Sequence, residues 1–293
     1  MLELMKTFYL NTYKFMKGSP MDQDYTNRLN RLDQLNTVEE TAGLTPKRPH
    51  RRPQPIYTDK MFWVLMVVSV LSQLAIWWIY PLIYSKHLVG GPWQENPLLV
   101  FYSILLALAT YLTFSYGLTS RINYLFILVP LAFIYFLYQQ MTVQQIILLI
   151  LLPLSLFLIN ISWLNLQNIL GLILYSGIAT LSLPVVIFYQ QNTFLTTPFL
   201  LSLLPLFLCY LYYMSSIFIP DGQNKRITSL IFGIILLINV LTLPWNFWTF
   251  LAIVVIVITW MVFINYDLKF KYRMGFLSFF EMITVLIIFL QQR

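Results

Sequence analysis

Nine apolar runs, each bounded by polar or charged residues, follow one another along the chain from residue 61 onward. An α-helix crosses the hydrocarbon core of a bilayer with about 20 apolar residues, and most of the runs approach or exceed this length, although the third, fourth and last are short. The pattern therefore predicts an all-α, polytopic transmembrane helical bundle of about nine spans. The expected spans are residues 61–84, 97–116, 122–138, 146–159, 169–189, 198–219, 227–243, 247–264 and 276–290.

The first 60 residues have a different pattern, which predicts a cytoplasmic arm. In residues 1–17, apolar and aromatic side chains recur at helical spacing opposite lysines, which is typical of an amphipathic helix in the lipid headgroup layer or against a partner protein. A polar, helix-capable segment follows at 22–42. Prolines then space a basic segment at 45–55, which we expect to be extended. The chain thus divides into an arm, residues 1–60, and a membrane bundle, residues 61–293.

The composition excludes a water-soluble domain, because 59% of the residues are hydrophobic and only 10% are charged, against about 25% charged in soluble domains. A net charge of +7 is compatible with nucleic-acid binding. However, the lysines and arginines lie in the arm and in short connections, which favours anionic lipid as their partner. We expect no nucleic-acid partner. The expected headgroup contacts are Lys47, Arg48, Arg51 and Arg52.

The distribution of positive charge also predicts the orientation. Basic residues directly before the first span place the amino terminus in the cytoplasm, and nine crossings then place the carboxyl terminus outside. This orientation assigns three basic connections to the cytoplasm; they carry Arg121, then Lys225 and Arg226, then Lys269, Lys271 and Arg273. The asymmetry and the short loops indicate a plasma membrane, and we expect a bacterial one.

Few residues suit catalysis or metal binding. Cys209 is the only cysteine, and the two histidines, His50 and His87, fall on opposite predicted sides of the membrane, so we expect no cysteine cluster and no histidine metal site. No serine-hydrolase, zinc-protease, P-loop or Rossmann motif is present. The sequence predicts no catalytic residue, no metal and no cofactor.

One candidate site lies inside the spans and consists of Glu281, Asn239 and Gln73. A charged group at bilayer depth costs roughly 2.5 to 3.5 kcal/mol, so Glu281 carries a functional hypothesis as a protonatable or cation-pairing group. The simpler alternative is a glutamate near the inner surface that pairs with Lys271 or Arg273. The two amides either bridge helices or contact a substrate.

A second candidate site lies in cytoplasmic connections. One connection supplies Asn160, Asn165 and Asn168, which form either a hydrated turn or a substrate-facing loop; the other supplies Asp221, Lys225 and Arg226. In addition, four consecutive spans contain a proline. Because proline breaks the backbone ladder and transporters use broken helices at their binding sites, we expect a cavity within spans three to six. The prolines are Pro130, Pro153, Pro184 and Pro205.

Three classes of function fit these features. We favour a transport-type protein, a permease or exporter component, whose substrate is apolar, lipid-like or neutral because intramembrane charge is scarce. The first alternative is a non-catalytic scaffold or accessory subunit that binds a membrane or cytoplasmic protein through residues 1–60. Deletion of the arm distinguishes the two, since a scaffold loses its complex while still inserting.

The third class is a lipid-modifying membrane enzyme. Nine helices with the amino terminus inside resemble the UbiA prenyltransferase family, whose active site lies in the cytoplasmic loops after the second and sixth helices. The corresponding loops here are 117–123 and 220–226. The second loop contains Asp221, Gly222, Lys225 and Arg226, similar to that family's second aspartate motif. The first contains no carboxylate, and neither has the paired aspartates that hold magnesium on a diphosphate.

Overall fold

The structure is a computed structural model that describes residues 60–85, 96–118, 120–191, 195–219, 223–265 and 270–292. Every regular element in these ranges is a helix and none is a strand, which confirms the predicted all-α bundle. Six helical segments, with residues 169–190 counted as one, are long and apolar enough to cross a membrane, and three more are apolar but shorter. The structure is thus that of an integral membrane protein, and the crossing of the three shorter helices stays a prediction. The arm at residues 1–59 lies outside the described ranges.

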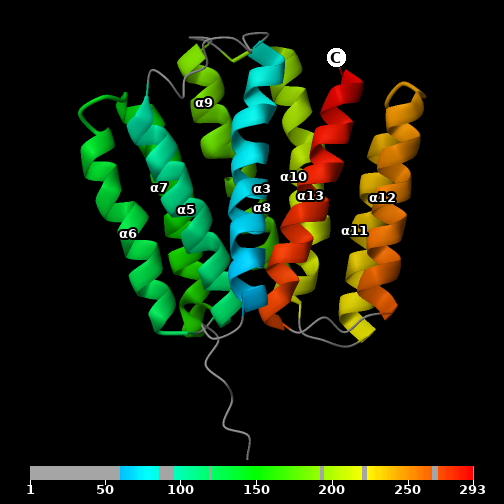
Figure 1. Cartoon of the computed structure of the whole chain (residues 1–293), viewed down its shortest axis with the longest axis horizontal. Helices are drawn as coiled ribbons and strands as arrows, with labels where there is room; N and C mark the ends of the chain where they lie inside the picture. Colours follow the sequence, from blue (N-terminus) through cyan, green and yellow to red (C-terminus); the bar gives the residue numbers. More distant parts are fainter. Residues whose placement is uncertain are drawn as a thin grey trace, which may run out of the picture. The chain divides into compact units, whose positions relative to one another are not determined.

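The helices run side by side, alternately up and down, with α6 and the pair α11–α12 on opposite flanks (Figure 1). Their bounds are α3 (Lys60–Ser85), α5 (Pro97–Tyr116), α6 (Ile122–Leu137), α7 (Val143–Asn160), the 3-10 helix η2 (Ser162–Leu164), α8 (Ile169–Leu181), α9 (Leu183–Gln191), α10 (Thr197–Phe218), α11 (Gln223–Leu241), α12 (Phe247–Asn265) and α13 (Phe270–Gln292). The first residue of α3 and the last of α13 lie at opposite ends of the bundle (Figure 1). This placement fits an odd number of crossings.

Three helices, α7, α11 and α13, begin three or more residues earlier than the apolar pattern predicts. α7 begins at Val143, because Thr142 caps it and its backbone N–H donates to the side chain of Gln145 at 3.0 Å. α13 begins at Phe270 and has 23 residues, so the expectation of a short last helix is wrong. Charged residues end an apolar run in the sequence but do not end a helix, and Lys271 and Arg273 simply occupy the first turn of α13.

The fifth apolar run forms two helices. Pro184 has no N–H to donate to the carbonyl of Thr180, and its ring collides with that carbonyl in a continuous helix. Accordingly α8 ends at Leu181, α9 begins at Leu183, and the intervening Ser182 donates from its hydroxyl to the carbonyl of Leu148 on α7 at 2.8 Å. The span is broken, and the break is held against its neighbour.

The other three prolines leave their helices continuous, because α6, α7 and α10 each run through one. In α7, Pro153 frees the carbonyl of Leu149, and the hydroxyl of Tyr102 on α5 donates to that carbonyl at 2.7 Å. The freed group therefore faces a packed tyrosine and not a cavity. An open apolar groove lies elsewhere, between α3 and α5, and is lined by Leu74, Ala75, Trp78, Ile79 and Val100.

α3 and α13 pack closely as parallel neighbours (Figure 1). A Cβ atom added at Gly275 of α13 would lie 2.7 Å from the Cβ of Leu65, so only glycine permits this approach. One turn further along both helices, the hydroxyl of Ser69 donates to that of Ser278 at 3.0 Å. This contact places the middle of α13 beside the middle of α3, where the polar side chains of the core lie.

Candidate functional site

Tyr210 of α10 is fully buried at the centre of the bundle. Its hydroxyl accepts a hydrogen bond from Nε1 of Trp77 at 3.1 Å and donates one to Oε1 of Gln73 at 3.3 Å. Both partners belong to α3 and lie one helical turn apart, which fixes α10 against α3. The second polar atom of Gln73, the donor Nε2, is buried and has no partner within the described residues.

Glu281 is the only carboxylate side chain in the described ranges, and it is 0% exposed. It lies near the middle of α13, roughly 16 Å along the helix axis from Phe270 at about 1.5 Å per residue. Neither carboxylate oxygen has a hydrogen-bond partner in the described part of the chain. Of the two basic residues expected as partners, Arg273 donates to the carbonyl of Ser216 at 3.1 Å, and the side chain of Lys271 lies outside the described part of the structure. Burial at mid-helix does not fit the interfacial alternative.

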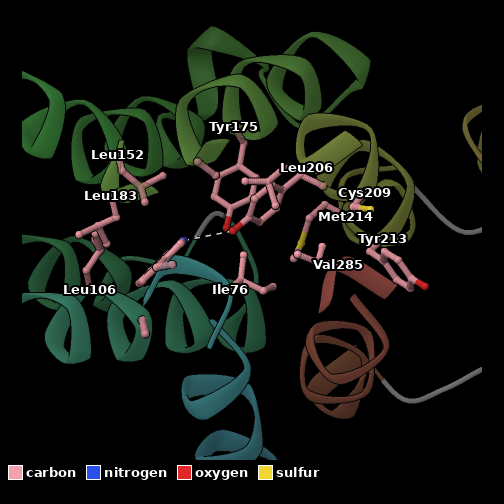
Figure 2. Close-up of a cluster of buried hydrophobic side chains, with 14 of the residues drawn as sticks. Ile76, Leu106, Leu152, Tyr175, Leu183, Leu206, Cys209, Tyr213, Met214 and Val285 are labelled. Atoms are coloured by element: carbon pink, nitrogen blue, oxygen red, sulfur yellow. Dashed lines mark hydrogen bonds between the residues drawn. The ribbon is translucent and has the colours of Figure 1, made fainter. Parts of the chain in front are cut away.

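Two tyrosines lie near Glu281 in the core: Tyr210 and Tyr175, which comes from α8. The rings of the two tyrosines meet edge to face with their centroids 6.2 Å apart. Figure 2 shows Tyr175 inside the cluster of buried side chains. The Tyr175 hydroxyl is buried and has no hydrogen-bond partner in the described part of the chain.

We call Gln73, Tyr175, Tyr210 and Glu281 the core polar site. The four side chains come from α3, α8, α10 and α13 and are all 0% exposed. Apolar side chains surround them, among them Ile76, Leu206, Met214 and Val285 (Figure 2). A buried polar group without a partner costs about 1 to 3 kcal/mol, so the site retains the capacity to bind water, a proton or a hydrogen-bonding ligand.

Asn239, the third residue of the intramembrane candidate, lies apart from Glu281 and Gln73. It belongs to α11, which packs against α10 and α12. Its Oδ1 is buried without a partner among the described residues, and no recorded interaction joins it to the core polar site. The structure therefore groups Gln73 with Glu281 around Tyr210 and leaves Asn239 elsewhere.

The asparagines after α7 have structural partners. Asn168 caps α8 by accepting from the backbone N–H of Leu170 at 2.8 Å and donates to the carbonyl of Asn165 at 2.9 Å. Asn165 has a left-handed backbone, with φ of 47°, which asparagine tolerates well. Asn160 is buried, and its Oδ1 accepts from Nδ2 of Asn123 at 2.7 Å. The bonds of Asn168 are those of a turn and a helix cap, and the bond of Asn160 joins α7 to α6.

The remaining candidates are only partly described. Asp221 and the four basic residues of the arm, Lys47, Arg48, Arg51 and Arg52, lie outside the described ranges. Lys225 and Arg226 belong to the first turn of α11, where Arg226 is exposed. In the part of the chain that the structure covers, no three His, Cys, Asp or Glu side chains group as metal ligands.

Nothing in the sequence alone selects Tyr175 and Tyr210 as site residues. In the structure both lie near Glu281, and Tyr210 also bonds to Gln73. The sequence of α13 does contain a pattern that predicts its buried face, because Gly275, Ser278, Glu281 and Val285 recur every three or four residues. Small and polar residues at that spacing mark a helix face that packs on other helices in membranes.

Comparisons of the chain with protein-family models, with curated proteins and with solved structures gave no match.

Proposed function

We propose that the protein is a transport-type plasma-membrane protein for a neutral, apolar or lipid-like substrate, and that the core polar site takes part in transport. One observation carries this proposal: polar atoms of Gln73, Tyr175 and Glu281 that have no hydrogen-bond partner among the described residues lie near Tyr210 in an apolar core, and they come from three helices. A rigid scaffold gains no stability from unpaired buried groups. Intramembrane ionisable residues mark ion and substrate pathways instead.

The broken span supports a moving part in the core. Tyr175 belongs to α8, which packs against α7 and α10 and is separated from α9 at Ser182. Discontinuous helices let one half of a span move while the other stays in place. Movement of α8 would carry Tyr175 away from Tyr210 and open the core polar site.

We further propose that all nine apolar helices cross the membrane, with the amino terminus in the cytoplasm. Every lysine and arginine in the described ranges belongs to the first turn of a helix or directly precedes it, and these helix starts all lie at one end of the bundle (Figure 1). The helices concerned are α3, α6, α11 and α13. Such an accumulation is typical of the cytoplasmic face.

The arm, residues 1–60, has its own role in the proposal as a segment that binds the inner leaflet. Each basic residue near an anionic leaflet contributes about 1 kcal/mol. Lys47, Arg48, Arg51 and Arg52 would therefore hold residues 1–60 against the inner leaflet, where a partner protein can also bind. A separate role as an accessory subunit predicts that deletion of residues 1–55 releases a partner while the bundle still inserts.

The natural Cys209 allows a direct test of transport against a static scaffold. It is the only cysteine of the chain, it is 0% exposed, and it lies close enough to Glu281 to interact with it. A thiol reacts with a water-soluble methanethiosulfonate reagent only when water reaches it. The experiment measures labelling of the full chain in liposomes, with reagent added from one side at a time.

A transport protein is labelled slowly but completely from at least one side, because its core opens. A static scaffold stays unlabelled until detergent and denaturant unfold it, and that result would refute the proposal. The Cys209→Ser variant gives the background, and the denatured wild-type chain gives the full signal.

A further inference from the structure

We propose that Glu281 is a proton-binding site, whose side chain is a neutral carboxylic acid in the closed bundle and exchanges its proton with water when the core opens. The inference deepens the proposed function and rests on it, since exchange requires an opening core. It assigns the proton as a ligand of the core polar site and couples the movement of the helices to the binding and release of one proton.

The burial of Glu281 away from basic side chains favours its neutral acid form. Glu281 is 0% exposed, and no lysine, arginine or histidine side chain in the described ranges is recorded in an ion pair with it. An isolated carboxylate in an apolar medium is far more costly than a neutral acid, which keeps only the smaller cost of an unpaired hydroxyl. The closed structure therefore favours the acid.

The side chains that face Glu281 carry no positive charge that would stabilise its carboxylate. The titratable side chains that interact with it are Tyr175 of α8 and Cys209 and Tyr210 of α10, all neutral at physiological pH. α3 contributes the amide of Gln73, which meets Tyr210. Neither α5 nor α12 contributes a titratable group to Glu281 within the described residues. Nothing recorded around the carboxyl supplies a positive charge.

The core polar site also contains hydrogen-bond donors that could stabilise the carboxylate of Glu281. The carboxylate formed after proton release needs hydrogen bonds to persist, and two donors of the same site have no partner among the residues that the structure describes: the hydroxyl of Tyr175 and Nε2 of Gln73. Charge-assisted bonds of this kind are about twice as strong as neutral ones. In the closed bundle the site thus holds Glu281 as the neutral acid. When the helices move, the two donors can turn toward Glu281 and bond to its carboxylate.

A metal cation fits the site less well than a proton. Hard cations take about six or more oxygen ligands. The core polar site offers five side-chain oxygens, two from Glu281 and one each from Gln73, Tyr175 and Tyr210, and Oε1 of Gln73 already accepts from Tyr210 at 3.3 Å. A proton needs a single carboxylate oxygen.

The proposed step is a simple acid–base exchange. When water enters, the O–H bond of the Glu281 carboxylic acid breaks, the proton passes to a water molecule, and the carboxylate retains the electron pair. When the core faces water on the other side, the carboxylate takes a proton from a water-derived hydronium ion and the O–H bond forms again. No other reactant is needed.

Infrared spectroscopy of the full chain in lipid bilayers tests this inference. A protonated carboxylic acid has a carbonyl band separate from the amide bands, and the band shifts when deuterium replaces the proton. We expect the wild-type chain at neutral pH to show the band, the Glu281→Gln variant to lack it, and transfer to heavy water to shift it at a rate that parallels labelling of Cys209.

The outcomes separate the two proposals. A wild-type chain without the band, or a band that persists in Glu281→Gln, overturns the proton site even where Cys209 is labelled. A band that exchanges no faster than the chain unfolds, together with an unlabelled Cys209, overturns the proposed transport function instead. If Glu281→Gln does not fold, wild-type protein made with carboxyl-labelled glutamate shows that the band belongs to a glutamate. A variant in which Glu3, Glu39, Glu40 and Glu95 are all replaced by glutamine then leaves Glu281 as its only glutamate source.

Discussion

The hydroxyl of Tyr210 donates to Oε1 of Gln73 at 3.3 Å, joining α10 to α3 across 137 positions of sequence. The same hydroxyl accepts from Trp77, so its removal leaves two buried groups of α3 without a partner. Each such group costs about 1 to 3 kcal/mol. We predict that Tyr210→Phe lowers the free energy of unfolding by about 2 kcal/mol or more, measured by thermal unfolding in detergent.

Tyr175→Phe is the matched control for Tyr210→Phe. It removes a hydroxyl that is also fully buried but has no recorded hydrogen bond in the described part of the chain. We therefore expect Tyr175→Phe to leave the melting temperature unchanged or to raise it. Equal losses in the two variants would show that Tyr210 is not the polar link between α3 and α10.

A second prediction concerns the stability cost of the core polar site. Replacing Glu281 by an apolar residue of similar length, Glu281→Met, removes two unpaired oxygens from the packed core. We expect this variant to be more stable than the wild-type chain by about 1 to 3 kcal/mol, while proton exchange is lost. A less stable variant would indicate that Glu281 has a stabilising partner.

A third prediction concerns the contact of α3 with α13. In Gly275→Ala the new Cβ would lie 2.7 Å from the Cβ of Leu65 and 3.1 Å from its carbonyl oxygen, so the two helices must separate. Overpacking of this kind costs about 1 to 3 kcal/mol. Thermal unfolding should show a clear loss of stability in this variant.

Gly177→Ala on α8 provides the comparison for Gly275→Ala. The added Cβ meets no atom closer than the Cε2 of Phe207 at 3.9 Å, which is ordinary contact. Alanine is also favoured over glycine in a helix by about 0.5 to 1 kcal/mol. Gly177→Ala should therefore be neutral or stabilising, and a loss equal to that of Gly275→Ala would refute the proposed close contact.

The bond between Tyr102 and the carbonyl of Leu149 gives a fourth prediction. This carbonyl is free because Pro153 has no N–H, so Tyr102→Phe leaves it unpaired and should cost about 1 to 3 kcal/mol. In a Pro153→Ala background the backbone N–H of residue 153 can pair with the carbonyl. Tyr102→Phe should then cost much less, and equal costs in both backgrounds would contradict the compensation.

The sequence predicts the helices well because a bilayer leaves few alternatives. Backbone groups without water must bond within a helix, so an apolar run such as 97–116 becomes α5 with the same bounds. The prediction fails where a charge interrupts the run without ending the helix, as at Lys271 and Arg273. That error allowed the alternative of a Glu281 near the inner surface, although the residue lies in the middle of α13.

The arrangement of the helices is much harder to read from the pattern. Apolar residues cover both the lipid-facing and the buried sides of these helices, so hydrophobicity does not separate the two faces. The partners Ser69 and Ser278 are 209 positions apart, and no local pattern pairs them. Small residues give the better signal, since Gly275 and Ser278 mark the side of α13 that packs against α3.

The asparagines show a related limit. Asn160 and Asn168 have the polarity of a binding loop in the sequence, yet in the structure they bond to Asn123 and to the first turn of α8. An amide suits a helix cap and a substrate contact equally well. Only the surrounding backbone distinguishes the two uses.

The proposed nine-span topology would place Glu281 at mid-membrane and the basic helix starts in the cytoplasm, and one measurement tests it most directly. Alkaline phosphatase is active only outside the bacterial cytoplasm, whereas green fluorescent protein fluoresces only when it folds inside, so each is fused after Arg293 in the full chain. We predict an active phosphatase and a dark fluorescent protein. The reverse result, a fluorescent fusion with an inactive phosphatase, would contradict the odd number of crossings.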